Sequence, residues 1–222
     1  MNSTELPPGQ RVHRDHPRFG LPWYAHRSPR DLAPVAVELV GPSGARSLLT
    51  DADLGSLEHR TQRSDLHCVT TWTHLGIRWS GVPFQVVYDE VIRPRVDPDG
   101  TAPFLTFTGQ DGYKDETCTA DLGAADVLLA TGMNGRPLTL RHGGPLRLVA
   151  PAHYGYKSVK YLTRIELRRD TCHRLPWSAH HPRGRVAYEE RILGLPDRLI
   201  RLIYQRLVLP PTLWWYQRHP RD

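Results

Sequence analysis

Asp65-Leu66-His67-Cys68-Val69-Thr70-Thr71-Trp72-Thr73 is the stretch around which the rest of this sequence is arranged. It predicts a short strand at residues 66–69 that carries a cysteine and continues into a polar, aromatic loop. A cysteine in a strand is usually a small core residue. Because successive strand residues point to opposite faces, His67 and Cys68 are not expected to chelate one metal ion. Taken alone, this stretch favours neither a zinc site nor a histidine-activated nucleophile.

A second stretch, residues 142–161, concentrates basic groups and glycines. It reads His142-Gly143-Gly144-Pro145-Leu146-Arg147-Leu148-Val149-Ala150-Pro151, followed by Tyr154-Gly155-Tyr156-Lys157-Ser158-Val159-Lys160-Tyr161. The glycines let the backbone approach a ligand closely. Arginine offers a planar fork to phosphate oxygens, and lysine offers a point charge. On residue types alone, a site for a phosphate-bearing heterocycle and an ordinary strand–turn–strand with a basic surface are equally open.

Composition limits the class of protein. The chain has 222 residues, 39% of them hydrophobic, which is enough for one substantial core. No apolar run approaches the roughly 20 residues of a membrane span, and the N-terminus lacks a basic region followed by an apolar one, so we expect a cytoplasmic location. Three cysteines without metal-finger spacing argue against a disulfide framework. The net charge is +6, but the arginines are scattered and no nucleic-acid motif occurs, so no nucleic acid is expected as a partner.

Hydrophobic patterning predicts an α+β protein with a mixed sheet. Strands are expected at 35–40, 66–69, 104–108, 127–131, 146–149 and 161–167. Thr50-Asp51-Ala52-Asp53-Leu54 has the hydroxyl and the acids of a helix start. Residues 82–92 are expected to form a helix with Phe84, Val87 and Val91 directed inward. Asn134-Gly135 is the strongest hairpin turn in the chain.

The C-terminal part differs in character after about Arg168. Residues 171–222 are predicted to be a linker and an amphipathic helix at 196–208, which Pro210-Pro211 would end, and residues 1–170 one domain with an N-terminal arm at 1–32. One helix face is apolar and comprises Leu199, Leu202, Ile203 and Leu207. We expect this helix to cap the domain or to form an oligomer contact, in preference to peripheral contact with an anionic membrane.

Several motifs together resemble one known family. The two stretches, with Trp79-Ser80-Gly81-Val82 and Met133-Asn134-Gly135-Arg136-Pro137-Leu138, resemble the sulfite oxidase family, in particular small bacterial members that consist of the molybdopterin-binding domain alone. The resemblance runs from about Arg18 to Leu167. It implies a sulfite-oxidase-type molybdopterin-binding fold with mixed β-sheets. It also implies a molybdenum–molybdopterin cofactor, two-electron oxygen-atom transfer on a small-molecule substrate between Mo(VI) and Mo(IV), and a separate electron-transfer partner.

The resemblance also implies site residues. Cys68 matches the cysteine whose thiolate ligates molybdenum in this family, and a soft thiolate suits such a metal. Tyr113, in the turn Asp111-Gly112-Tyr113, is expected near the open face of the metal, where its hydroxyl would orient substrate, although a buried structural tyrosine is equally open. The residues expected to contact the cofactor, besides Cys68, are Trp23, Tyr24, Ala25, Thr108, Gly109, His142, Arg147, Lys157, Ser158, Val159 and Lys160.

One departure from the family bears on the substrate. Sulfite oxidases follow their cysteine with arginines that help to bind the anion, whereas Val69-Thr70-Thr71-Trp72-Thr73 contains none. Sulfite is therefore not an assured substrate. Two alternatives are a reductase for S-oxides such as methionine sulfoxide, and a non-catalytic cofactor-binding or membrane-docked scaffold that uses the C-terminal helix.

Overall fold

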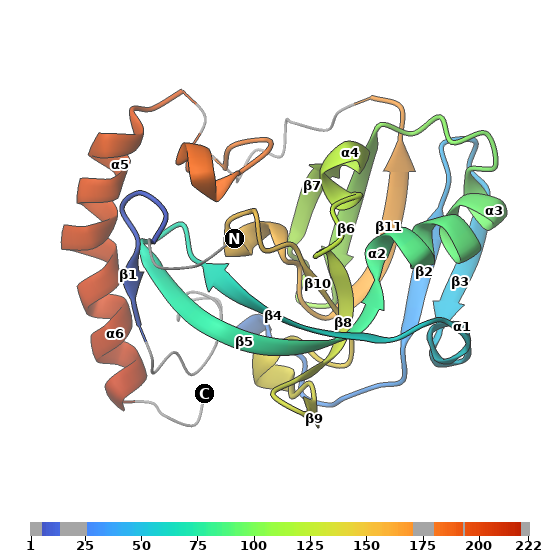
Figure 1. Ribbon diagram of the computed structural model, residues 1–222, viewed down its shortest axis with the longest axis horizontal. Helices are drawn as coiled ribbons and strands as arrows, with labels where there is room; N and C mark the ends of the chain where they lie inside the picture. The colour runs from blue at the N-terminus through green and yellow to red at the C-terminus, as the bar shows by residue number, and fades with distance from the viewer. Residues whose placement is uncertain (1–5, 14–25, 171–179, 193, 219–222) are drawn as a thin grey trace.

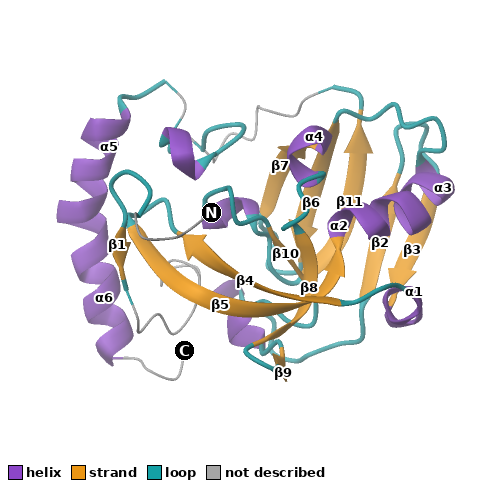
Figure 2. Cartoon of the chain, viewed as in Figure 1, coloured by secondary structure: helices purple, strands orange, loops and turns teal. Residues whose placement is uncertain are grey.

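The computed structural model describes residues 6–13, 26–170, 180–192 and 194–218. Two mixed β-sheets make up most of it, with short helices at their edges and one long helix at the C-terminal end (Figures 1 and 2). The predicted α+β class with mixed sheets is confirmed. The predicted arm residues Trp23, Tyr24 and Ala25 lie outside the described residues.

The five-stranded sheet has the order β3-β2-β11-β6-β7. Its strands are β2 (Ala36–Val40), β3 (Arg46–Thr50), β6 (Phe104–Gly109), β7 (Lys114–Cys118) and β11 (Leu162–Arg168). β11 runs parallel to β2 and antiparallel to β6. In β2, Val37 and Leu39 are completely buried whereas Glu38 between them is partly exposed, as the period of two of a half-buried strand requires.

The six-stranded sheet carries both sequence stretches. It contains β1 (Arg11–Val12), β4 (Arg60–His67), β5 (Trp72–Pro83), β8 (Leu128–Met133), β9 (Arg136–Pro137) and β10 (Arg147–Val149). β1, β5, β8 and β10 follow one another, β4 pairs with β5, and β9 pairs with β8. β5 is a long curved strand that extends from the C-terminal helix toward the five-stranded sheet (Figure 1).

Two sequence-based expectations about this sheet need correction. The strand expected at 66–69 is β4, which begins at Arg60 and ends at His67, so Cys68 and Val69 lie in a turn. The residues after Cys68 were expected to form a loop, but β5 begins at Trp72 and has 12 residues. The reason is pairing, because β5 forms hydrogen bonds with β4 on one side and with β8 on the other, which satisfies its polar backbone. The Asn134-Gly135 hairpin joins β8 to β9 as expected.

The main core lies against the five-stranded sheet and a helical segment, which consists of α2 (Phe84–Val87), the π-helical η2 (Tyr88–Ile92) and α3 (Arg93–Val96). Phe84, Val87 and Val91 are buried as predicted, and the Phe84 and Phe107 rings meet edge to face at 5.8 Å. The helix runs four residues beyond its predicted end. The wider π-helical turn before Pro94 relieves the clash that a proline ring makes with a preceding carbonyl.

Short helical elements complete the domain. They are α1 (Asp51–Ser56), α4 (Thr119–Leu122), η3 (Leu140–His142), η4 (Gly155–Lys157) and η5 (Val186–Tyr188). Thr50 caps α1, because its hydroxyl accepts from the Asp53 amide while the Asp53 carboxylate accepts from the Thr50 amide. The helix start predicted at this point is thus present.

The C-terminal helix departs from its prediction in two ways. It comprises α5 (Asp197–Ile203), η6 (Tyr204–Val208) and α6 (Leu209–Arg218), so Pro210 and Pro211 do not end it. Here too a π-helical turn, in which the Leu209 amide donates to the Tyr204 carbonyl, precedes the prolines. The helix packs on the domain, as we expected, but not through the predicted face. The buried residues are Ile200, Leu209, Thr212 and Tyr216, whereas Leu199, Leu202, Ile203 and Leu207 are exposed.

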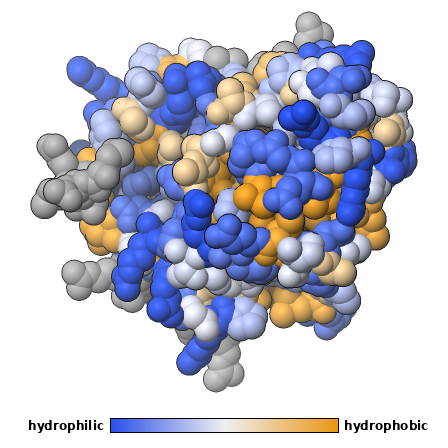
Figure 3. Space-filling view, turned by 45° about the vertical axis from the view of Figure 1, so that its right-hand side comes forward, coloured by the Kyte–Doolittle hydropathy of each residue, from blue (hydrophilic) through white to orange (hydrophobic). Residues whose placement is uncertain are grey.

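The surface is mixed in character. The face shown in Figure 3 is largely hydrophilic, with hydrophobic side chains gathered in a patch right of its centre. Within the residues that the structure describes, no helix has the length and apolarity that a membrane span requires.

Candidate functional site

Cys68 occupies the turn between β4 and β5. The Cys68 amide donates to the Trp72 carbonyl at 2.8 Å, and the Thr71 amide donates to the Cys68 carbonyl at 3.1 Å. Thr71 has a φ of +77°, which is uncommon for a β-branched residue and marks a turn that its surroundings must hold in place. The Cys68 Sγ lies 3.1 Å from the Thr70 hydroxyl. The thiol is therefore presented by a tight turn and not by the strand.

Apolar side chains and the Thr70 hydroxyl surround the Cys68 thiol. The side chain packs against two apolar clusters, one containing Leu66 and the other Val69 and Tyr154. Burial raises the pKa of the Cys68 thiol, and the hydrogen bond from Thr70 lowers it by less. A raised pKa disfavours the free thiolate that a nucleophile needs, whereas coordination to a metal ion deprotonates a thiol outright. The geometry thus fits a metal ligand better than a catalytic thiolate.

The second stretch lies beside the Cys68 turn. His67 pairs with Tyr154 in an isolated parallel bridge, although 87 positions separate them in the sequence (154 − 67). The buried His67 ring lies 2.9 Å from the Thr73 hydroxyl, which in turn donates to Gln10. The His67–Tyr154 bridge thus brings the two stretches that the sequence singles out into one place.

Arg147 joins the two halves of the second stretch. Its side chain is fully buried, with its guanidinium 5.1 Å from the centre of the Trp79 ring. Nη1 donates to the His142 carbonyl at 2.8 Å, and Nη2 donates to the Ser158 carbonyl at 3.1 Å. The planar fork therefore fixes the positions of both segments at once.

Positive charge converges around His142. Burial lowers its pKa to about 4, with further lowering by the charges of Arg147, Lys160 and Arg141. Its Nδ1 lies 3.0 Å from the Thr139 hydroxyl. Several cations held near a neutral, half-buried imidazole form an environment that an anion would stabilise. These residues fit the phosphate end of a cofactor.

Two glycines permit the close packing of Lys160. A Cβ at Gly143, where φ is +97°, would lie 2.6 Å from the Lys160 Cγ. A Cβ at Gly109 would lie 2.4 Å from the Lys160 carbonyl oxygen. Thr108 precedes Gly109 in β6, and its carbonyl accepts from the Thr163 hydroxyl. The structure thus brings Thr108 and Gly109 to the same segment as Lys160.

Three other predicted residues are engaged in the interior. The Lys157 ammonium group donates to Asp115 at 2.6 Å and to the Glu116 carbonyl at 2.5 Å. The Ser158 hydroxyl accepts from the Ala150 amide at 3.1 Å. Val159 is buried in the main core. The role of these three as cofactor ligands stays a prediction.

Tyr113 has partners of its own. Its hydroxyl lies within donating distance of the Asp115 carboxylate, at 3.1 Å, and of the Tyr156 carbonyl, at 3.0 Å. Burial, with the nearby Asp115 charge, raises the pKa of Tyr113 well above its usual value. These bonds favour the structural alternative, and substrate orientation by Tyr113 stays a prediction.

Residues near both ends of the chain contact the Cys68 turn, and the sequence does not predict these contacts. The Gln10 amide donates to the Cys68 carbonyl at 3.1 Å. Arg191 donates to the Val69 carbonyl at 2.5 Å. Tyr204, from the C-terminal helix, packs in the same cluster as Cys68. Nothing local in the sequence marks these residues, because their roles depend on contacts between distant segments.

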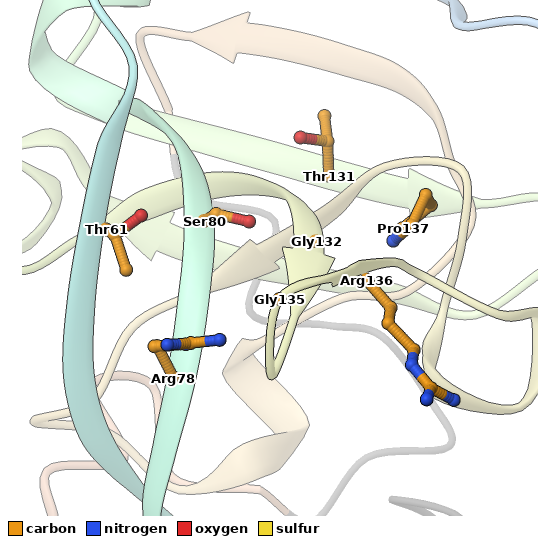
Figure 4. A pocket seen from close by; sticks show the side chains of 8 residues that line it. All are labelled: Thr61, Arg78, Ser80, Thr131, Gly132, Gly135, Arg136 and Pro137. Carbon is orange, nitrogen blue, oxygen red and sulfur yellow. The ribbon is translucent and has the colours of Figure 1, made fainter.

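A separate cavity of about 490 Å³ lies over β4, β5, β8 and β9 (Figure 4). It is lined by Thr61, Arg78, Ser80, Thr131, Gly132, Gly135, Arg136 and Pro137. None of the predicted site residues that the structure describes is among them. The cavity is therefore distinct from the surroundings of Cys68.

Comparison with known proteins identifies the class. The model of the oxidoreductase molybdopterin binding domain matches residues 30–176, about two-thirds of the chain. The chain belongs to this family, whose members are enzymes that bind molybdenum–molybdopterin, and the cofactor and the family expected from the sequence are confirmed.

The chain is also similar to individual oxidoreductases. The chain is 29% identical over 187 residues to the uncharacterized oxidoreductase YuiH of Bacillus subtilis, covering 82% of this chain and 89% of the relative. It is 30% identical over 178 residues to the protein-methionine-sulfoxide reductase catalytic subunit MsrP of Xanthomonas campestris, covering 65% of this chain and 52% of the relative. The fold resembles the sulfane dehydrogenase SoxCD of Paracoccus pantotrophus, with a TM-score of 0.57 and 20% identity over 74% of this chain and 46% of that one. The chain therefore spans only about half of the length of these last two proteins.

Proposed function

We propose that this molybdopterin-dependent oxidoreductase transfers an oxygen atom between a small substrate and water, with Cys68 as the protein ligand of molybdenum. The observation that carries the proposal is the bridge between His67 and Tyr154, because it sets the Cys68 turn beside the basic second stretch. When bound, the cofactor supplies two-electron redox chemistry.

Different residues of the chain would bind different parts of the cofactor. Arg147 and Lys160, beside the neutral His142 imidazole, would contribute the positive charge that favours the anionic end of the cofactor. Gly109 and Gly143 leave room for the Lys160 segment to pack closely. Cys68, presented by its turn, would be the thiolate ligand of the metal, and a ligand of this kind would tune the metal's potential.

We infer that S-oxides are the substrate class. Relatives that are named protein-methionine-sulfoxide reductases, at 30%, 29% and 32% identity, support this choice. The absence of arginine from Val69 to Thr73 supports it as well, because an S-oxide, unlike sulfite, carries no net charge that needs a cation. The balanced reaction is reduction of the S-oxide by two electrons and two protons to a thioether and water. A separate electron-transfer partner would supply the electrons.

A substrate screen tests the proposal. Purified, cofactor-loaded protein is supplied with a reduced viologen dye and methionine sulfoxide, and in parallel with sulfite and an oxidised dye. We expect dye oxidation that depends on the sulfoxide and is lost in Cys68→Ser. Turnover of sulfite alone would contradict the substrate class, and equal turnover by Cys68→Ser would contradict the role of Cys68.

Peripheral contact with an anionic membrane is a second candidate, and one observation favours it. Leu199, Leu202, Ile203 and Leu207 form a stripe on the C-terminal helix that is exposed, together with Trp214. Arg198, Arg206 and Arg218 are exposed on the same helix. An apolar stripe flanked by arginines is typical of helices that lie in the plane of an anionic bilayer.

Flotation with vesicles tests this contact. The variant Leu199→Gln/Leu202→Gln/Leu207→Gln changes only exposed positions and leaves the buried contacts of Ile200 and Leu209 in place. We expect the wild-type protein to float with vesicles that contain anionic lipid and the variant to stay in solution. Equal recovery of the two proteins would reject membrane contact through this stripe. The cytoplasmic location stays a prediction.

A further inference from the structure

The side chain of Arg191 is completely buried, with 0% of its surface exposed. Its Nη1 donates to the Val69 carbonyl at 2.5 Å, and its Nη2 lies 3.3 Å from the Pro8 carbonyl. Its guanidinium lies 4.9 Å from the centre of the Tyr154 ring. One side chain from the C-terminal part of the chain thus contacts an N-terminal loop, the Cys68 turn and the second stretch.

We propose that Arg191 is a positioning residue that holds the Cys68 turn in the conformation in which Cys68 binds the metal. The segment that carries Arg191 is then a part of the site and not an appendage to it. This inference rests on the proposed function, because it assumes that Cys68 is the ligand.

The chemistry of the contact requires an arginine. Val69 and Pro8 belong to segments far apart in the sequence, and each offers one carbonyl oxygen. A guanidinium group has several N–H donors in a rigid fork, so it satisfies both carbonyls in one geometry, whereas the ammonium group of a lysine is a compact point charge. Because burying a cation is costly, an arginine at this position indicates a conformational role that an apolar residue would not fulfil.

The turn itself needs such support. Thr71 has a positive φ, a conformation that a β-branched residue rarely adopts unless its surroundings impose it. Arg191 binds the carbonyl of Val69, two residues before Thr71, and Gln10 binds the carbonyl of Cys68. The turn is thereby held from both ends of the chain.

Arg191 acts on the turn and not on the substrate. With no exposed surface, its guanidinium is closed off from a molecule that enters from solvent. The Glu189 carboxylate lies 3.4 Å from its Nη2 and also accepts from Arg201. A sulfite-type anion would compete with this carboxylate. Arg191 therefore does not replace the arginines that are missing after Cys68.

Three variants test the proposal. Arg191→Gln removes both the positive charge and the planar set of guanidinium N–H donors, whereas Arg191→Lys keeps the charge but not the planar donors. Arg185→Gln is the matched control. Arg185 lies in the same segment and pairs with Glu190, its side chain is 30% exposed, and it makes no bond to the Cys68 turn. In apoprotein, the rate of Cys68 alkylation by a neutral reagent is read by peptide mass spectrometry, with Cys118 as the internal reference. In loaded protein, molybdenum content and the Mo(V) EPR spectrum are measured.

At equal thiolate fraction, we expect Cys68 to be alkylated roughly tenfold faster in Arg191→Gln than in wild type, because the turn loses its bond to a charged donor and opens. Loss of the Arg191 charge by itself raises the pKa of the thiol, so the rates are compared after correction for that pKa. The Mo(V) EPR spectrum of Arg191→Gln should broaden or shift. Arg191→Lys should show an alkylation rate and a spectrum between those of Arg191→Gln and wild type. Arg185→Gln should show the wild-type rate and spectrum. Unchanged alkylation and an unchanged spectrum in folded Arg191→Gln would overturn the proposal. If Arg191→Gln does not fold, the test rests on Arg191→Lys. A wild-type alkylation rate and a wild-type EPR spectrum in Arg191→Lys would also overturn the proposal. A wild-type spectrum in Cys68→Ser would instead show that the proposed function has failed.

Discussion

The ammonium group of Lys157 lies 2.6 Å from the carboxylate of Asp115, and only 2% and 6% of these side chains are exposed. This ion pair ties η4, in the middle of the second stretch, to β7 in the five-stranded sheet. Tyr113 donates to the other oxygen of the same carboxylate. Asp115 is thus one point at which the basic stretch is anchored to the domain.

Asp115→Asn should destabilise the apoprotein by about 3–5 kcal/mol, because it leaves the Lys157 charge buried without its partner. Urea unfolding followed by circular dichroism measures the change. Asp170→Asn is the control, since the Asp170 side chain is 82% exposed and its pair with Arg168 should contribute less than about 1 kcal/mol. Equal midpoints for the two variants would contradict a structural role for the buried pair.

Arg147→Lys should lower the molybdenum content of the purified protein at least about fivefold, because lysine cannot bond the His142 and Ser158 carbonyls in one fixed geometry. Elemental analysis of protein made in a cofactor-competent host measures this. Arg136→Lys, at an exposed position of the separate cavity, should keep the wild-type content. If Arg147→Lys retains as much metal as Arg136→Lys, the fork of Arg147 is not needed for the cofactor.

His142 should make the stability of the apoprotein depend on pH. Its folded pKa of about 4 is below the ordinary value of 6.5, so between these values the unfolded chain binds the proton and the folded chain does not. Stability should therefore fall as the pH is lowered from 6.5 to 4, by about 1–2 kcal/mol after solvent screening. His142→Asn should lose that part of the dependence. Urea midpoints at each pH measure this dependence. If stability changes with pH equally in both proteins, groups other than His142 cause the change.

Gly109→Ala should destabilise the protein by about 1–3 kcal/mol and reduce cofactor retention, because the new Cβ would lie 2.4 Å from the Lys160 carbonyl. Gly55→Ala in α1 is the matched control, since nothing lies within 4 Å of its Cβ position. Alanine in a helix interior should stabilise the control by about 0.5–1 kcal/mol. Thermal unfolding and metal analysis of the two variants measure both effects. A wild-type melting temperature and metal content in Gly109→Ala would refute the close approach of Lys160.

Local patterning predicts a part of this fold well. The strands β2, β6, β8 and β11 and the inward residues of the helical segment at 84–96 follow from the alternation or the helical period of apolar residues. β5 was missed because its alternation around Ile77 and Trp79 is short and is interrupted at Gly76, where φ is +63°. Only the pairing of β5 with β4 and β8, which no local signal encodes, makes it a strand.

The sequence likewise predicts only a part of the candidate site. Motif resemblance leads to Cys68, His142 and Arg147, because their spacing is kept along the chain. It does not lead to Gln10, Arg191 or Tyr204, which reach the Cys68 turn from outside the matched region. The C-terminal helix was assigned the wrong buried face for a related reason. A helix with apolar residues on more than one side does not reveal which side meets the domain.

Coordination of molybdenum by Cys68 is tested most directly by X-ray absorption at the molybdenum edge. Wild-type protein, with about one molybdenum per chain, is compared with Cys68→Ser and with the control Cys118→Ser. We expect one sulfur neighbour fewer around molybdenum in Cys68→Ser than in the other two proteins, with a changed Mo(V) EPR spectrum. The same number of sulfur neighbours in all three proteins would contradict coordination by Cys68.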